Sequence, residues 1–138
     1  MDAARRLAHG VVMKAHTPED THALLAAAVN AGDIDAFAAV YEANAQLIVP
    51  PDGVLATGRE AIREALRPTF ALNAASARID VVEKLESDGL ALTQANWHIA
   101  GTDDSGAAVE LAGRGAIVSR RQPDGSWLIV LDNPIAPA

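Results

Sequence analysis

Few side chains in this sequence have both the type and the position to perform chemistry, and Asp132 is the best placed of them. It follows the apolar run WLIVL at residues 127–131, which is predicted to be a strand, so its carboxyl group is expected to be partly buried. A buried carboxylate must be paired, protonated or functional, because water no longer stabilises its charge. Asp132 is therefore our candidate acid or base. The alternative is that it only caps the turn after the strand.

Two aromatic side chains are the next candidates. Trp97 lies between Asn96 and His98 in a predicted strand, and its indole belongs either to the core or to a ligand platform. Tyr41 closes the apolar stripe of a short predicted helix that begins at Ile34. A buried tyrosine hydroxyl needs a hydrogen-bond partner. The alternative for Tyr41 is a core ring whose hydroxyl group reaches water.

The sequence contains no pattern for a metal, a phosphate group or a dinucleotide. Its histidines, His9, His16, His22 and His98, are not at metal-ligand spacing and are predicted to be scattered surface or boundary residues. The GxSxG motif is absent as well. The run GRG at residues 113–115 lies inside a predicted strand, where glycines permit a bend or a close contact more often than they bind phosphate. We expect no metal and no cofactor.

Composition restricts the partners and the location. The chain has 138 residues, half of them apolar, which suits one domain with a packed core. Its formal net charge of −7 argues against nucleic acid, since phosphate binding needs a cationic face. No apolar run approaches the ~20 residues of a membrane span, and residues 1–16 carry too much charge for a secretory signal. We expect a cytoplasmic protein that binds neither nucleic acid nor a membrane.

The elements that would position these side chains are helices first and strands afterwards. Two helices that meet at the corner NAGD are followed by a strand at residues 46–49 and a third helix from residue 58. After the third helix the apolar residues recur at every second position. Ile79, Val81 and Leu85 alternate with charged residues, as in a half-buried strand. Three more predicted strands follow. This order predicts an α+β domain with its helices on one face of an antiparallel sheet. The domain is expected to span residues 17–138, after an N-terminal extension at residues 1–16.

Three segments give the chain a family resemblance. LAAAVNAGDIDAFAAVYEANAQLIVP, GREAIREAL and RRQPDGSWLIVLDNP resemble the ketosteroid isomerase-like (SnoaL-like) branch of the nuclear transport factor 2-like superfamily. The resemblance covers about residues 18–134. It implies a cone in which a strongly bent antiparallel sheet wraps around three helices and leaves a pocket between them. It also implies a homodimer formed through the outer face of the sheet.

The resemblance does not extend to the isomerase chemistry. Steroid isomerases hold an oxyanion with a tyrosine and a protonated aspartate and use a second aspartate as the base. These three positions fall on Leu25, Ile117 and Val49, which are all apolar. Transferring the family's pocket positions to this chain implies a lining that has Tyr41 toward its back wall. The other lining positions are Leu25, Val29, Val49, Ala65, Ala95, Trp97, Ile117, Val130 and Asp132.

Two functions agree with these observations. The first is an enzyme or binding protein for a small apolar molecule, such as a ketone- or polyketide-like compound, with Asp132 as acid or base. The second is a non-catalytic dimeric module whose pocket is filled by its own side chains. A cavity of roughly 300 Å³ or more beside Trp97 and Asp132 would favour the first function, and a closed core would favour the second.

Overall fold

The computed structural model describes residues 14–136, which form three helices and one six-stranded sheet. The helices are α2 (Pro18–Ala31), α3 (Ile34–Ala38) and α4 (Arg59–Phe70). None of them is long and apolar enough to span a membrane. The expected α+β class is therefore confirmed. The extension predicted at the N-terminus lies outside the described residues, apart from residues 14–16.

Local sequence signals account for the first two helices. Thr17 begins α2 with a capping box, in which its side chain accepts a hydrogen bond from the Asp20 amide while the Asp20 carboxylate accepts one from the Thr17 amide. Gly32 ends α2 in the left-handed conformation at φ 67°, which only glycine adopts without strain. Asp33 then caps α3 by accepting a hydrogen bond from the amide of Ala36.

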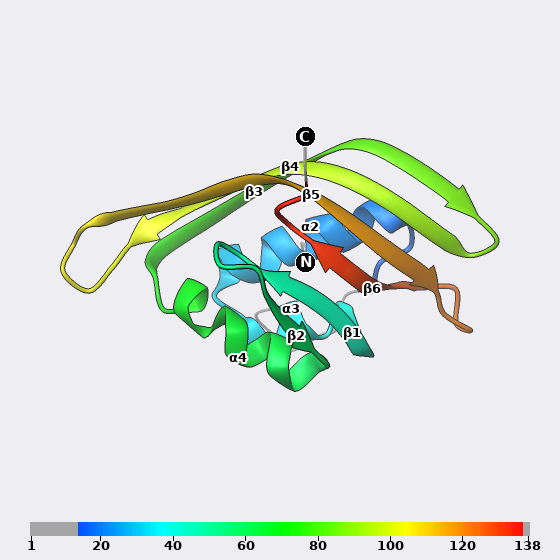
Figure 1. The fold of residues 1–138 in the computed structure, drawn as a ribbon, viewed down its shortest axis with the longest axis horizontal. Coiled ribbons are helices and arrows are strands. Elements are labelled where there is room, and N and C mark those ends of the chain that lie inside the picture. Colours follow the sequence, from blue (N-terminus) through cyan, green and yellow to red (C-terminus); the bar gives the residue numbers. More distant parts are fainter. Residues whose placement is uncertain (1–13, 137–138) are drawn as a thin grey trace.

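The sheet is bent and unclosed, and it arches over the helices (Figure 1). Its strands are β1 (Tyr41–Val49), β2 (Val54–Thr57), β3 (Asn73–Ser87), β4 (Leu90–Thr102), β5 (Ala108–Arg121) and β6 (Trp127–Asn133). They lie side by side in the order β2-β1-β6-β5-β4-β3. Every pair of neighbours is antiparallel except β1 and β6, which run parallel. Helix α2 contacts β3, and α4 contacts β1 and β2.

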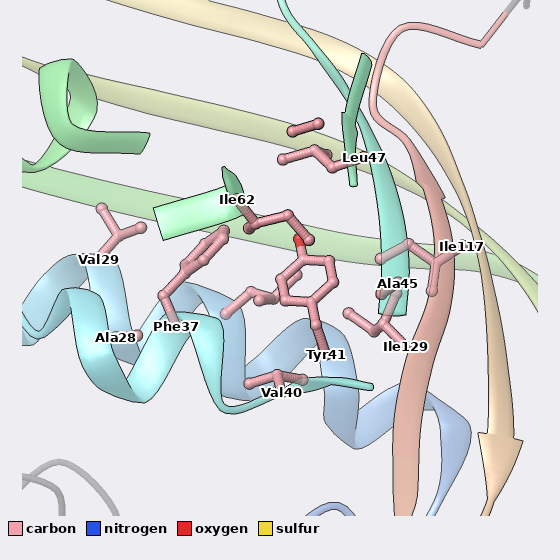
Figure 2. Packing of buried hydrophobic residues seen from close by; sticks show 12 residues of the cluster. Ala28, Val29, Phe37, Val40, Tyr41, Ala45, Leu47, Ile62, Ile117 and Ile129 are labelled. Carbon is pink, nitrogen blue, oxygen red and sulfur yellow. The ribbon is translucent and has the colours of Figure 1, made fainter. Parts of the chain in front are cut away.

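The core lies between the helices and the concave face of the sheet. Figure 2 shows the Tyr41 ring at its centre, between Phe37 of α3 and Ile129 of β6. The Phe37 and Tyr41 ring centroids are 5.8 Å apart, and Phe70 meets Phe37 edge-on at 5.6 Å. Ile62 of α4 and Ile129 are completely buried beside them. This cluster fixes the strand ends and helix faces from which the site is built.

The prediction that Tyr41 belongs to a helix is wrong. Helix α3 ends at Ala38, and Tyr41 begins β1 opposite Ile129. The amide of Ile129 donates a hydrogen bond to the carbonyl of Val40, so pairing with β6 starts where the helical stripe was expected to continue. Val40 and Tyr41 are residue types that favour a strand, and contact with a distant strand outweighs the local helical period.

Candidate functional site

A cavity of ≈110 Å³ lies between the helices and the concave face of the sheet. Most of its lining is apolar, and the ionisable groups in it are His22, Tyr41 and Asp132. Of the residues expected at the pocket, the lining contains Leu25, Val29, Tyr41, Val49, Ala65, Ala95, Trp97, Ile117 and Asp132. Val130 is not among the lining residues.

The cavity is closed at one end. Along β4 its lining passes from half-buried Ile99 and Trp97 to Ala95, which is 2% exposed, and the buried His22 of α2 lines the cavity too. Tyr41 and Asp132 also belong to the buried part of the lining. A ligand would therefore meet apolar walls first and polar groups at the inner end.

Asp132 and Tyr41 form a buried pair at that end. The hydroxyl group of Tyr41 donates a 2.6 Å hydrogen bond to Oδ2 of Asp132. Burial raises the pKa of Asp132 from its ordinary 3.8 to about 6, although the hydrogen bond from Tyr41 opposes that rise. Burial and the neighbouring carboxylate raise the pKa of Tyr41 well above 10, so the phenol keeps its proton. Near neutral pH the pair can accept a hydrogen bond or exchange a proton with a ligand.

A bulge in β6 explains why Val130 does not line the cavity. Opposite β5, Ser119 pairs with Ile129 and Val118 pairs with Leu131, so Val130 is an extra residue without a partner. The family resemblance had assigned both Val130 and Asp132 to the pocket lining, which requires them to share one face of the strand. The bulge instead places Asp132 on the same face as Ile129, and this inward-facing set excludes Val130.

Trp97 belongs to the cavity wall and also holds the residues just after β6 in place. Its indole nitrogen donates a 2.7 Å hydrogen bond to the carbonyl of Pro134, a residue that lines the cavity too. Gly113 and Gly115 allow this approach, because a Cβ atom at either position would lie 3.0 Å from backbone atoms of Pro134. The GRG run thus serves a close contact, as its place inside a strand indicated.

His22 is a cavity residue that the sequence reasoning missed. It is 3% exposed, and its Nε2 atom shares a 2.6 Å hydrogen bond with Oγ1 of Thr93. Burial lowers the pKa of the imidazole from 6.5 to about 4, although Glu19 opposes that shift, so the ring is neutral at pH 7. The available signal was spacing: His22 precedes Leu25 by three residues and Val29 by seven, which places all three on one face of α2.

The site supports acid–base chemistry or hydrogen bonding. Within residues 14–136 no group of three His, Cys, Asp or Glu side chains is placed to hold a metal ion. The cavity is also smaller than the ~300–1,000 Å³ of most ligand pockets. At ≈110 Å³ it is neither the large cavity nor the closed core that we used to separate the two functions. It is comparable to the roughly 150 Å³ of an engineered protein cavity that binds benzene.

Comparison with known proteins agrees with this fold. A family model described as a SnoaL-like domain matches residues 21–129. No match was found among curated protein sequences.

Solved structures from three bacteria are similar. A ketosteroid isomerase-like protein from Erwinia carotovora atroseptica is 21% identical, with a TM-score of 0.70 over 86% of this chain and 94% of that one. A Thiobacillus denitrificans protein, provisionally named a calcium/calmodulin-dependent protein kinase type II association domain, is 23% identical, with a TM-score of 0.70 over 90% and 99%. A nuclear transport factor 2-like protein with a cystatin-like fold from Novosphingobium aromaticivorans is 16% identical, with a TM-score of 0.66 over 83% and 75%. At these identities the structures establish the fold alone.

Proposed function

Because the chain belongs to the family of SnoaL-like domains, we propose that its cavity binds a small, largely apolar ketone- or polyketide-like compound and that Asp132 contacts the polar group of that compound. The family and fold suggest a domain that binds or modifies a small molecule. The observation that carries the proposal is the Asp132–Tyr41 pair at the closed end of an otherwise mainly apolar cavity.

The geometry supports binding through one buried polar contact. The Tyr41 hydroxyl donates its hydrogen bond to Oδ2 of Asp132, which leaves the second carboxylate oxygen to accept one from a ligand hydroxyl. The pKa of about 6 leaves both forms of the carboxyl group populated near neutral pH, so a ligand carbonyl can also accept a proton or hydrogen bond from the neutral form. The cavity volume admits one ring, and any larger compound extends beyond the half-buried rim.

The site does not support the steroid isomerase reaction. Leu25, Val49 and Ile117 all line the cavity, and their side chains carry no group that can donate, accept or transfer a proton. Proton abstraction next to a ketone needs a base and donors for the resulting oxyanion. Asp132 and Tyr41 are the groups of this cavity on which different chemistry could be built.

A thermal-shift screen with small cyclic ketones and phenols tests the proposal. A ligand that binds only the folded state raises its stability, by about 2.7 kcal/mol at a concentration one hundred times Kd. The expected hits raise the Tm of the natural protein and raise that of Asp132→Asn much less, each compared with its own ligand-free sample. Asp104→Asn, in the exposed β4–β5 hairpin, is the matched control and should respond like the natural protein. The proposal is wrong if no compound raises the Tm, or if Asp132→Asn responds equally.

A second candidate function is a dimeric assembly module, and the outer face of the sheet favours it. Leu85, Leu92, Val118 and Leu131 lie in one register across β3, β4, β5 and β6. We call these four residues the outer apolar row. Leu85 is 60% exposed and Leu131 is 46% exposed, so the row presents apolar surface to solvent.

A bulge also corrects our expectation for Leu85. Val81 pairs with Ala95 and Glu83 pairs with Gln94, so Val82 is an extra residue, and the residues beyond it face the opposite way. Leu85 was expected on the half-buried face with Ile79 and Val81, and it lies on the outer face instead.

Polar groups surround the row, including Arg114 hydrogen-bonded to Gln94 at 3.0 Å. His98 lies 3.1 Å from Glu110 farther along the same face. We propose that this face joins two copies of the chain, because an apolar centre with a polar rim is typical of a stable interface. Sedimentation equilibrium at tens of micromolar tests this proposal, and a monomer there would contradict it.

A further inference from the structure

We propose that His22 is a second recognition residue of the cavity, so that the preferred ligand is a one-ring molecule with two hydrogen-bonding oxygens on non-adjacent ring carbons. This inference rests on the proposed function and adds the substitution pattern of the ligand. Its basis is a second buried polar pair, His22 with Thr93, whose histidine lines the same cavity as Tyr41 and Asp132.

The register of the sheet fixes the spacing of the two pairs. Thr93 of β4 lies opposite Ile117 of β5, and Ile117 lies opposite Asp132 of β6. Neighbouring strands are about 4.8 Å apart, so Thr93 and Asp132 are roughly 10 Å apart along one row. His22 is hydrogen-bonded to Thr93, and Tyr41 is hydrogen-bonded to Asp132. The two polar pairs therefore flank the apolar side chain of Ile117 at the closed end of the cavity.

This spacing selects a ligand geometry. Because the backbones that carry the two pairs are separated by two strand spacings, the ligand oxygens that contact His22 and Asp132 must lie apart from each other on the ligand. Oxygens on alternate carbons of a six-membered ring are farther apart than oxygens on adjacent carbons and suit this arrangement better. The apolar ring between them would lie over Ile117, and the cavity volume of ≈110 Å³ suits a single ring.

The chemistry of His22 suits this role. Its imidazole is neutral at pH 7, because burial holds its pKa at about 4. One ring nitrogen, Nε2, is occupied by Thr93, and Nδ1 makes no hydrogen bond to any of the residues between 14 and 136. A neutral imidazole has one donor and one acceptor nitrogen, so the second nitrogen remains available to a ligand hydroxyl. Asp132 would accept a hydrogen bond from the other hydroxyl.

NMR titrations with phenol, resorcinol and catechol test the inference. Phenol carries one hydroxyl, resorcinol two on alternate carbons and catechol two on adjacent carbons. We expect resorcinol to bind roughly 5-fold more tightly than phenol, the gain from one net hydrogen bond, and catechol to show no such gain. In the natural protein, the imidazole nitrogen signals of His22 should shift with resorcinol and stay in place with phenol.

A double variant assigns the gain to the second pair. His22→Leu with Thr93→Val replaces both partners by apolar groups, so no buried hydroxyl is left unpaired. This variant should bind phenol and resorcinol equally. Thr21→Val is the matched control, because Thr21 is equally buried on the same turn of α2 and does not line the cavity. It should keep the preference for resorcinol.

The outcomes separate this inference from the proposed function. If none of the three compounds binds at the cavity, both are wrong. If phenol binds and resorcinol gains nothing, the inference alone is overturned. The inference also fails if the double variant keeps the preference, or if the His22 signals respond to phenol and resorcinol alike. The last measurement uses the natural protein and does not depend on the folding of the variant.

Discussion

Asp132→Asn should make the protein more stable at neutral pH. The pKa of Asp132 rises from 3.8 to about 6 on folding, because burial disfavours the charged carboxylate. At about 1.4 kcal/mol per pKa unit, the charged form costs on the order of 3 kcal/mol of folding free energy at pH 7. Asparagine never ionises and can still accept the hydrogen bond from Tyr41, although its amide group then needs a partner of its own. We expect a net gain of about 1–3 kcal/mol at pH 7.

The pH dependence of that gain is the sharper part of the prediction. Below pH 3.8 the carboxyl group is protonated in the folded and unfolded chains alike, so its ionisation has no effect on stability. Between pH 3.8 and about 6 the unfolded chain releases this proton and the folded chain retains it, so the natural protein loses stability as the pH rises. Above about pH 6 the loss is complete. The advantage of Asp132→Asn should therefore be absent near pH 3.5, grow through this window and level off.

Urea unfolding at half-unit steps from pH 3.5 to pH 8 measures this curve. Asp104→Asn is the control, since its exposed side chain should change stability by less than ~0.5 kcal/mol. NMR titration of the Asp132 carboxyl carbon provides an independent reading, with an expected midpoint near 6. A midpoint at or below 3.8, or a variant whose advantage does not change with pH, would refute the reasoning. Asp132 would then be only the cap of the turn after β6.

Three further outcomes follow from the same structure. Tyr41→Phe removes the hydrogen-bond donor of a buried carboxylate, so it should raise the pKa of Asp132 beyond about 6. It should also lower the unfolding free energy at pH 7 by about 1.5–3 kcal/mol. An unchanged NMR midpoint for Asp132 would contradict this. The protein should not isomerise a Δ5-3-ketosteroid above a buffer blank, since one missing oxyanion donor alone typically lowers the rate about 10²–10³-fold. Leu92→Glu should make the protein a monomer in sedimentation equilibrium at concentrations where we expect the natural chain to dimerise. Equal masses for both would count against the outer apolar row as the interface.

Local signals were sufficient for both ends of α2 and for the start of α3. The Thr17 cap, the NAGD corner and the helical spacing of α2 depend on neighbours within a few residues, and the structure has each of them. The α+β class and the family were accessible because helices precede strands in this chain and because the motifs are specific. Tyr41 shows the limit: a helical stripe and a strand start are both compatible with its neighbours, and contact with β6 decides between them.

The site was harder to predict from the sequence, because it depends on how distant strands pair. The alternation of apolar and polar residues does not determine that pairing. Asp132 was recognisable from the apolar run before it, yet its hydrogen bond to Tyr41 joins residues 91 positions apart. His22 was treated as a surface or boundary histidine, because its partner Thr93 belongs to another element 71 positions away. Val130 and Leu85 were assigned to the wrong face, since each follows or occupies a bulge that leaves no mark in the pattern of apolar residues.

The bulge at Val130 determines which side chain of β6 points into the cavity beyond Ile129. The extra residue acts on the strand as a frameshift acts on a gene: if Val130 were instead paired in regular alternation, the residues after it would exchange sides, so that Leu131 pointed inward and Asp132 outward. Trp127 and Ile129 precede the change and would keep their places in the core. Pairing Val130 into the ladder would thus put an aliphatic side chain where the cavity now has its acid, whereas deleting Val130 would leave Ile129 and Leu131 with their present partners and Asp132 inside. Relatives with one residue fewer at this point should therefore keep the acid in the cavity without needing a bulge.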